Sequence, residues 1–140
     1  MDAHPDLLWR LERIRRQAAV HMGLSQSLTE VPGSIPKIAM VSSPHDPGKD
    51  VVVRAISVGQ PHRAIPITVA MAVAAAARVK GSTVHRACQT PLVDPDGITI
   101  GHATGRILVK ANINPETNEV TDASVFRTAR LLMKGEVFWR

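Results

Sequence analysis

Hydrophobic and polar residues recur along this chain with two different periods, which predict where helices and strands lie. In residues 6–24 the apolar positions have helical spacing, which predicts an amphipathic helix that begins near Asp6 and ends at Gly23. The apolar positions of this helix are Leu7, Leu8, Leu11, Ile14, Ala18 and Met22. Short apolar runs bounded by turn residues predict strands elsewhere. These runs are residues 37–41, 51–58 (strand or helix), 83–86, 97–102, 105–111, 121–128 and 136–139.

Residues 65–79 form the most hydrophobic segment of the chain. They are rich in alanine, which favours a helix, and Pro66 suits a position in the first helical turn. The segment is apolar on all sides, so we expect the helix to be buried. Together with the strands it predicts an α+β fold: a curled, mostly antiparallel sheet around one buried central helix, with the helix at residues 6–24 outside. A length of 140 residues suits a single domain over residues 1–140.

Composition excludes several classes of function. The net charge of +5 attracts anions, but aromatic residues make up only 3%, too few to stack on single-stranded bases. The single cysteine, Cys88, excludes an internal disulfide and suits a packing residue. The six histidines lack metal-ligand spacing, so we expect no metal site. No apolar run reaches the ~20 residues of a membrane-spanning helix, and no signal peptide is visible, so we expect a cytoplasmic protein.

Two glycine-bounded segments carry residues suited to ligand chemistry. Residues 59–68 lead into the apolar helix, whose first N–H groups can hold an anion. His62 and Arg63 there could move a proton or supply charge, and Thr68 a hydroxyl. The turn at residues 101–105 carries His102 and Thr104. A capping loop and a plain hairpin turn explain these two segments equally well.

Residues 17–29 mimic a DNA-binding helix-turn-helix, with basic residues before them that would suit phosphates. Pro32 ends any second helix early, and residues 25–31 hold no Arg or Lys to reach bases. An amphipathic surface helix with a solvated basic face is therefore the favoured interpretation.

The order of these motifs resembles the C-terminal part of the PrpF family, which includes 2-methylaconitate isomerases and 4-oxalomesaconate tautomerases. The resemblance covers nearly the whole chain. It rests on Leu11-Glu12-Arg13-Ile14-Arg15, Met22-Gly23-Leu24, Pro36-Lys37-Ile38-Ala39, Val58-Gly59-Gln60-Pro61-His62, Pro66-Ile67-Thr68, Gly101-His102-Ala103-Thr104-Gly105 and Arg127-Thr128-Ala129-Arg130-Leu131-Leu132-Met133-Lys134-Gly135.

The resemblance implies a diaminopimelate epimerase-like fold of two similar halves, of which this chain is the C-terminal one. It implies cofactor-independent proton transfer that shifts a C=C bond in an unsaturated, aconitate-like di- or tricarboxylate. The implied substrate-binding residues are His62, Arg63, Pro66, Ile67, Thr68, His102 and Thr104, with His62 as the candidate catalytic residue. The family's proton-abstracting lysine and active-site cysteine belong to the N-terminal half, and Lys37, Lys49 and Cys88 do not match them. This chain departs from the family at two places. The family usually has Gly-His-Pro-Ser-Gly where this chain has residues 101–105, and two adjacent histidines where it has His62-Arg63.

Three hypotheses follow. The first is an isomerase part that is weak or inactive alone, because its base comes from an N-terminal half or from a second copy in a homodimer. The second is a non-catalytic anion-binding or self-associating module. DNA binding is a distant third.

Overall fold

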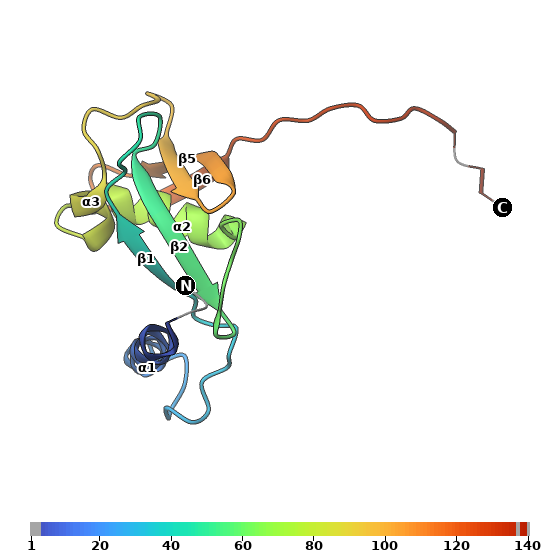
Figure 1. Cartoon of the computed structure of the whole chain (residues 1–140). Coiled ribbons are helices and arrows are strands. Elements are labelled where there is room, and N and C mark those ends of the chain that lie inside the picture. The colour runs from blue at the N-terminus through green and yellow to red at the C-terminus, as the bar shows by residue number, and fades with distance from the viewer. Residues whose placement is uncertain (1–3, 137, 140) are drawn as a thin grey trace.

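The computed structural model describes residues 4–136, 138 and 139 and contains three helices and six strands in these residues (Figure 1). The helices are α1 (Pro5–His21), α2 (Ile67–Arg78) and α3 (Thr83–Ala87); the strands are β1 (Ile38–Ser42), β2 (Val51–Ser57), β3 (Gln60–Pro61), β4 (Ile98–His102), β5 (Gly105–Ile113) and β6 (Val120–Val125). No helix in the described residues is both long and apolar enough to cross a membrane.

All six strands form one mixed sheet. Its order is β1-β2-β4-β5-β6, and β3 adds to β2 through a tight hairpin. β2 and β4 are parallel, and the other pairs are antiparallel, so the expectation of a mostly antiparallel sheet is confirmed. The expected curl is wrong for this chain: the sheet is open, and β1 and β6 lie at its two edges.

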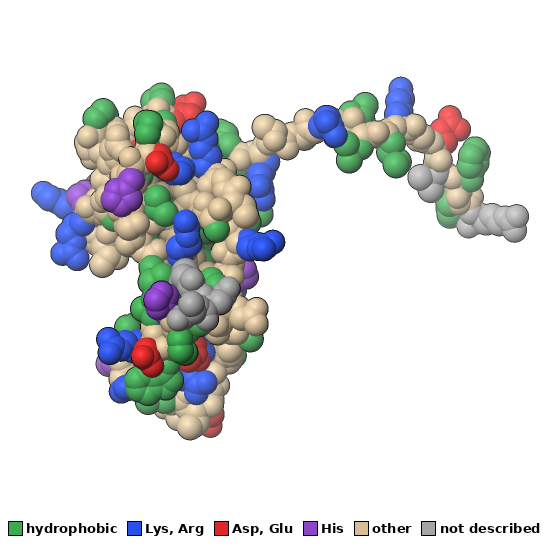
Figure 2. All heavy atoms as spheres, viewed as in Figure 1, with side chains coloured by type: hydrophobic (Ala, Val, Ile, Leu, Met, Phe, Trp, Pro, Cys, Tyr) green, Lys and Arg blue, Asp and Glu red, His purple; other side chains and the backbone are tan. Residues whose placement is uncertain are grey.

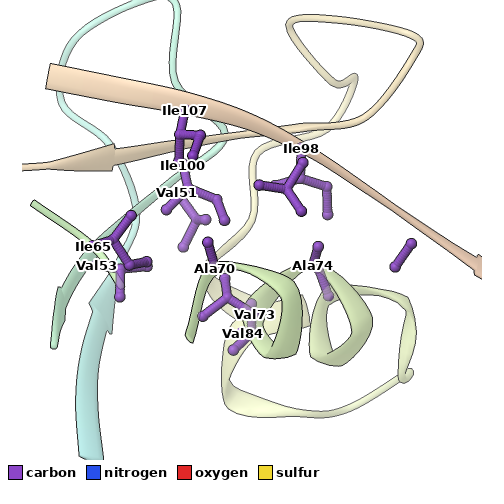
Figure 3. Packing of buried hydrophobic residues seen from close by; sticks show 13 residues of the cluster. Val51, Val53, Ile65, Ala70, Val73, Ala74, Val84, Ile98, Ile100 and Ile107 are labelled. Carbon is purple, nitrogen blue, oxygen red and sulfur yellow. The ribbon is translucent and has the colours of Figure 1, made fainter. Parts of the chain in front are cut away.

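The core lies between one face of the sheet and α2 (Figure 3). Side chains alternate along β2, so Val51 and Val53 point to this face, where Ile100 of β4 joins them. The helix contributes one buried face, made of Ala70, Val73, Ala74 and Ala77. Its other face is not enclosed as the sequence predicted, because the sheet covers only one side of it: Thr68 and Ala72 are exposed.

Helix α1 lies outside the sheet and ends where the sequence predicts. The N–H of Gly23 bonds to the carbonyl of Val20 and that of Leu24 to the carbonyl of Ala19, with Gly23 at φ 70°, which is a Schellman cap. The predicted apolar face is only partly correct. Of the predicted positions, Leu11 is buried, whereas Ile14 and Met22 are exposed; Ala19, which is not among them, is buried.

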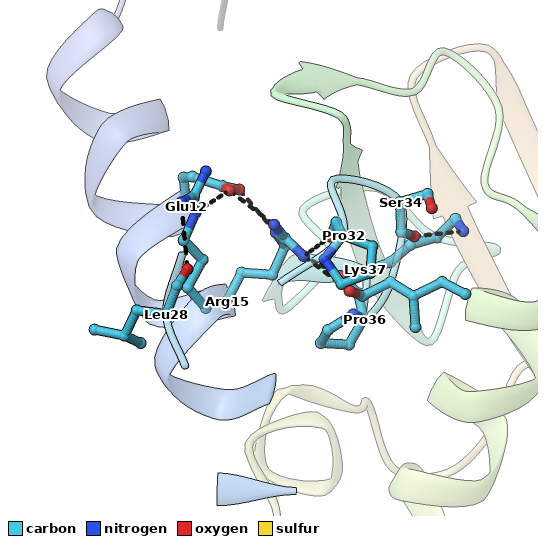
Figure 4. A network of polar contacts seen from close by, with 9 residues as sticks. Glu12, Arg15, Leu28, Pro32, Ser34, Pro36 and Lys37 are labelled. Carbon is cyan, nitrogen blue, oxygen red and sulfur yellow. Dashed lines mark hydrogen bonds and ion pairs between the residues drawn. The ribbon is translucent and has the colours of Figure 1, made fainter. Parts of the chain in front are cut away.

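Arg15, and not those apolar residues, makes the contact between α1 and the segment that leads to β1 (Figure 4). It is 2% exposed, and its guanidinium donates to the carbonyls of Pro32, Ile35 and Pro36 and pairs with Glu12 at 2.7 Å. The predicted solvated basic face is therefore wrong at Arg15. Residues 24–37 form no second helix, so the helix-turn-helix interpretation is not supported.

Two predicted strands take other conformations. Residues 83–86 lie in α3, because the Ser82 side chain caps this helix by accepting the N–H of His85. β6 ends at Val125, and the chain then runs extended away from the body (Figure 1). Glu136, Phe138 and Trp139 are not in a strand, and Val137 lies outside the described residues.

Candidate functional site

A cavity of about 650 Å³ lies beside the second half of β2, where β3 folds back along β2 toward the turn that follows β4. The end of β4 pairs with the start of β2, so Ala103, just after β4, lines the same cavity as Arg54 of β2. The cavity is lined by Leu8, Arg54, Gly59, Gln60, Pro61, His62, Arg63 and Ala103. Its charged lining residues are two arginines with no carboxylate, so it suits an anion.

His62 directly follows β3, and its N–H donates to the carbonyl of Ala55 at 2.9 Å. This bond fixes the backbone beside the cavity. The Nε2 of His62 is buried and has no hydrogen-bond partner among the described residues. It is the one buried side-chain nitrogen or oxygen in this state in the part of the chain that the structure describes. A buried polar atom normally has a partner, so a ligand group in the cavity is one way to satisfy this nitrogen.

The hairpin that precedes His62 is strained. Its two central residues, Val58 and Gly59, have φ values of 52° and 71°. Two positive φ angles are the pattern of a type I′ turn, which glycine tolerates and a β-branched valine does not. The cost is offset in part by the Val58 N–H, which bonds to the carbonyl of Gly33 at 3.2 Å. This turn sets the direction of β3, whose two residues line the cavity.

The turn after β4 joins the same site. Thr104 donates its hydroxyl to the carbonyl of Arg63 at 3.3 Å, and its N–H bonds to Nδ1 of His102. Burial lowers the pKa of His102, and the charges of Arg54 and Arg127 lower it further, while a hydrogen bond with the Arg63 backbone acts in the opposite direction. The imidazole is therefore held neutral near pH 7.

The predicted substrate-binding residues do not all meet. His62, Arg63, His102 and Thr104 lie together at the cavity and its adjoining turn. Thr68 instead lines a second, apolar cavity of about 500 Å³ between α2 and β1. Pro66 is the N-cap of α2 and Ile67 its first residue, and neither lines the basic cavity.

Arg54 is the residue that the sequence interpretation missed. It lies in β2, points away from the core face that Val53 occupies, and lines the cavity. The only signal is a single arginine within an apolar strand. That pattern indicates that the residue lies on the outer face of a sheet, but it does not indicate what this face contacts.

The lysines and the cysteine lie away from the basic cavity. Lys37 lines the apolar cavity, and Lys49 pairs with Asp46 at 3.0 Å. Burial raises the pKa of the Cys88 thiol to about 11, with a further contribution from the negative charge of Asp50. In the described residues, no three His, Cys, Asp or Glu side chains are grouped as a metal site requires.

Cys88 is expected to react slowly with iodoacetamide. A pKa of about 11 in place of 9.0 leaves about 100-fold less thiolate near pH 8, and the thiolate is the reactive form. Alkylation followed by mass spectrometry measures the rate, with the chain unfolded in urea as the control. A rate in the folded protein equal to that in urea would contradict the packing of the partly buried Cys88 against the core.

Comparison with known proteins identifies the family of the chain. The model of the family described as "PrpF protein" matches residues 1–140. The chain is 34% identical to "2-methyl-aconitate isomerase" of Shewanella oneidensis over 93% of its own length and 36% of the relative's. It is 33% identical to "(4E)-oxalomesaconate Delta-isomerase" of a Novosphingobium species over 99% of its own length and 37% of the relative's.

A solved structure supports the same assignment. The crystal structure of a methylitaconate-delta-isomerase matches 88% of this chain with a TM-score of 0.74 and 26% sequence identity. Only 36% of that chain takes part in the match. This chain thus spans a little over a third of the length of these relatives.

Proposed function

This chain belongs to the PrpF family, and we propose that it is the substrate-holding C-terminal part of a cofactor-independent isomerase. The reaction is the shift of a C=C bond by proton transfer in an unsaturated, aconitate-like di- or tricarboxylate. The observation that carries this proposal is the basic cavity, in which Arg54 and Arg63 lie beside the unpartnered Nε2 of His62.

The two arginines suit the charge that such a reaction develops. Removing a proton next to a carboxylate places further negative charge on the substrate, and cationic groups that are already in position stabilise that charge. Arginine also binds carboxylates with two parallel hydrogen bonds, which would orient the double bond. In this proposal Arg54 and Arg63 bind the carboxylates, and His102 and Thr104 hold the loop of Arg63.

The base is the missing element of the proposed site. Among the residues that line the cavity, His62 has the only side chain of a type that commonly acts as a base, and the lysine that the family resemblance implies for proton abstraction is absent from the lining. We therefore propose that the base comes from the rest of the family fold or from a second copy of the chain, and that the chain alone is weak or inactive. A single-domain organisation, a cytoplasmic location and independence of any cofactor remain predictions of the sequence.

The second candidate function is a non-catalytic module that binds an anion at the same cavity. The two arginines favour this function as much as they favour the isomerase, because they indicate that an anion binds but not that it reacts. The two functions differ in solvent exchange: only an isomerase labels the bound acid with deuterium.

Proton NMR in heavy water tests the binding of an anion, which both functions require, and any exchange above that of the acid without protein favours the isomerase over the non-catalytic module. The purified chain is incubated with trans-aconitate, and the spectra follow the amide shifts of the chain, the loss of substrate protons and the migration of the double bond. The expected result is binding near His62 and Ala103 with little or no exchange. Arg63→Gln is expected to weaken binding about tenfold, since it removes one charge-assisted contact.

Lys80→Gln is the matched control, because it removes one positive charge just after α2, at a residue that does not line the cavity. If both variants weaken binding equally, the attraction is a general effect of net charge and the proposed site is wrong. Rapid exchange by the unmodified chain would show that the chain has its own base, and His62→Ala would then be the first variant to measure.

A further inference from the structure

Arg15 is enclosed by the molecule although it belongs to a basic helix. Basic side chains lie on the surface of the part that contains α1 (Figure 2), whereas Arg15 is 2% exposed. Arg15 shares one face of α1 with Leu8 and Leu11, at successive helical turns. Leu8 lines the basic cavity, so the face of α1 that Arg15 holds against the body reaches the wall of that cavity.

Residues 32–36 lie between Arg15 and the turn that precedes β3. Three carbonyls of this segment accept hydrogen bonds from one guanidinium nitrogen of Arg15, at 2.8, 3.0 and 3.3 Å (Figure 4). The carbonyl of Gly33, within the same segment, accepts the N–H of Val58 at 3.2 Å. Because one charged nitrogen gathers three carbonyls, it fixes the segment and with it the position of the Gly33 carbonyl.

The turn at Val58 and Gly59 depends on that carbonyl. Val58 has a φ of 52°, which costs a β-branched residue free energy and persists only where neighbouring groups hold it. The bond to Gly33 ties the backbone of this turn to another part of the chain. β3 follows the turn directly, and His62 and Arg63 follow β3, so the turn sets where both residues lie at the cavity.

We propose that Arg15 is a positioning residue of the basic cavity and that it acts through residues 32–36 and the turn at Val58. Arg15 does not line the cavity itself. Its guanidinium fixes the segment, the segment fixes the turn, and the turn places Arg63 for an anion. The effect on anion binding rests on the proposed function, whereas the link from Arg15 to the turn does not.

The sequence of the turn offers a way to separate it from Arg15. Asn-Gly is a preferred sequence of the type I′ turn, because asparagine adopts a positive φ at little cost. Val58→Asn therefore lets the turn keep its shape without support from residues 32–36. If Arg15 acts through the turn, its loss should matter less in the Val58→Asn variant.

A double-mutant cycle of Arg15→Met and Val58→Asn tests the proposal. Amide NMR in ordinary water follows a titration with trans-aconitate. Arg15→Met is expected to weaken binding about fivefold in the unmodified background and less than about twofold in the Val58→Asn background. Without the acid, Arg15→Met is expected to shift the amide signals of His62 and Arg63. The double variant is expected to return them toward their original positions.

Arg16→Met is the matched control. Arg16 also pairs with Glu12, at 2.8 Å, but it donates to the carbonyl of Leu28, whereas Arg15 reaches residues 32–36. The control removes the same charge from the same helix, and it is expected to leave the signals of the cavity in place and to change binding less than about twofold. Arg15→Lys keeps the charge without the planar guanidinium, so it should cause a smaller loss than Arg15→Met.

Two results overturn the proposal once circular dichroism shows that the variants are folded. One is an Arg15→Met variant whose His62 and Arg63 signals do not move. The other is the same loss of binding in both backgrounds, because Arg15 would then act through Leu8 or through general stability. If the unmodified chain does not bind trans-aconitate, the proposed function fails, and the signals without the acid still decide whether Arg15 positions the turn.

Discussion

Replacement of Asp50 by alanine is expected to lower the free energy of unfolding by about 3 kcal/mol, which corresponds to roughly 10 °C in Tm for a chain of this size. Asp50 is completely buried, and its two carboxylate oxygens accept the N–H groups of Val93 at 2.8 Å and Thr99 at 2.7 Å. Alanine leaves both N–H groups without a partner, and each unpaired buried donor costs about 1–3 kcal/mol.

The position of Asp50 in the fold explains why the effect should be global. It precedes β2, and its backbone N–H bonds to the carbonyl of Thr99 while its carbonyl accepts the N–H of Gln89. These bonds hold the start of β2 against β4, where the only parallel pairing of the described sheet begins at Val51 and Ile100. The Asp50 carboxylate adds a bond from the Thr99 N–H of β4 at the same point, so its loss weakens the sheet and the core that lies on it.

Thermal unfolding followed by circular dichroism measures the effect. Asp50→Asn is expected to recover part of the loss, because the amide oxygen can still accept one N–H. Asp46→Asn is the control: Asp46 is exposed and pairs only with Lys49, so its loss should cost less than about 1 kcal/mol. Equal midpoints for Asp50→Ala and Asp46→Asn would show that the buried carboxylate does not stabilise the sheet.

Local sequence patterns predicted the parts of the fold that depend on neighbouring residues. The runs at residues 97–102 and 105–111 form the hairpin of β4 and β5, and Gly23 ends α1, because turns and caps need particular residues at particular positions. Burial that depends on residues far apart in the sequence could not be predicted in the same way. Arg15 is buried because three carbonyls of residues 32–36 face it, and nothing within the α1 sequence shows that they do.

Helix α2 shows the same limit of prediction from the sequence. Its sequence is apolar all round, which correctly indicates that the helix packs against other elements, but how much of it is covered depends on the elements that are present. In this chain one sheet face covers one helix face, and Thr68 and Ala72 remain exposed. For the same reason Thr68 could be assigned to the site of His62 from the sequence, although it lines the other cavity.

The second large effect is expected at Arg15. Replacement by methionine keeps about the length of the aliphatic part of the side chain but removes the guanidinium that holds α1 against residues 32–36. The carbonyls and Glu12 lose their partner, and about 2 kcal/mol of stability should be lost at this contact, less than for a fully buried ion pair because Glu12 is 31% exposed. Hydrogen exchange measured by NMR should show faster exchange in α1, with β4 and β5 unchanged. Arg10→Met, an exposed change on the same helix, is the control.

The same contact predicts an acid transition that Arg15→Met should move. The hydrogen bond from Arg15 lowers the pKa of Glu12 to about 2, with Arg16 adding to the effect and burial opposing it. A carboxylate whose pKa is lower in the folded state stabilises that state above its unfolded pKa of 4.5, and this contribution is lost as the pH falls through about 2. In Arg15→Met only Arg16 remains as a partner, so the Glu12 titration followed by carbon-13 NMR should shift upward toward 4.5. An unchanged midpoint would mean that Arg16 alone lowers the pKa of Glu12, and that Arg15 acts only by holding α1 to the carbonyls of residues 32–36.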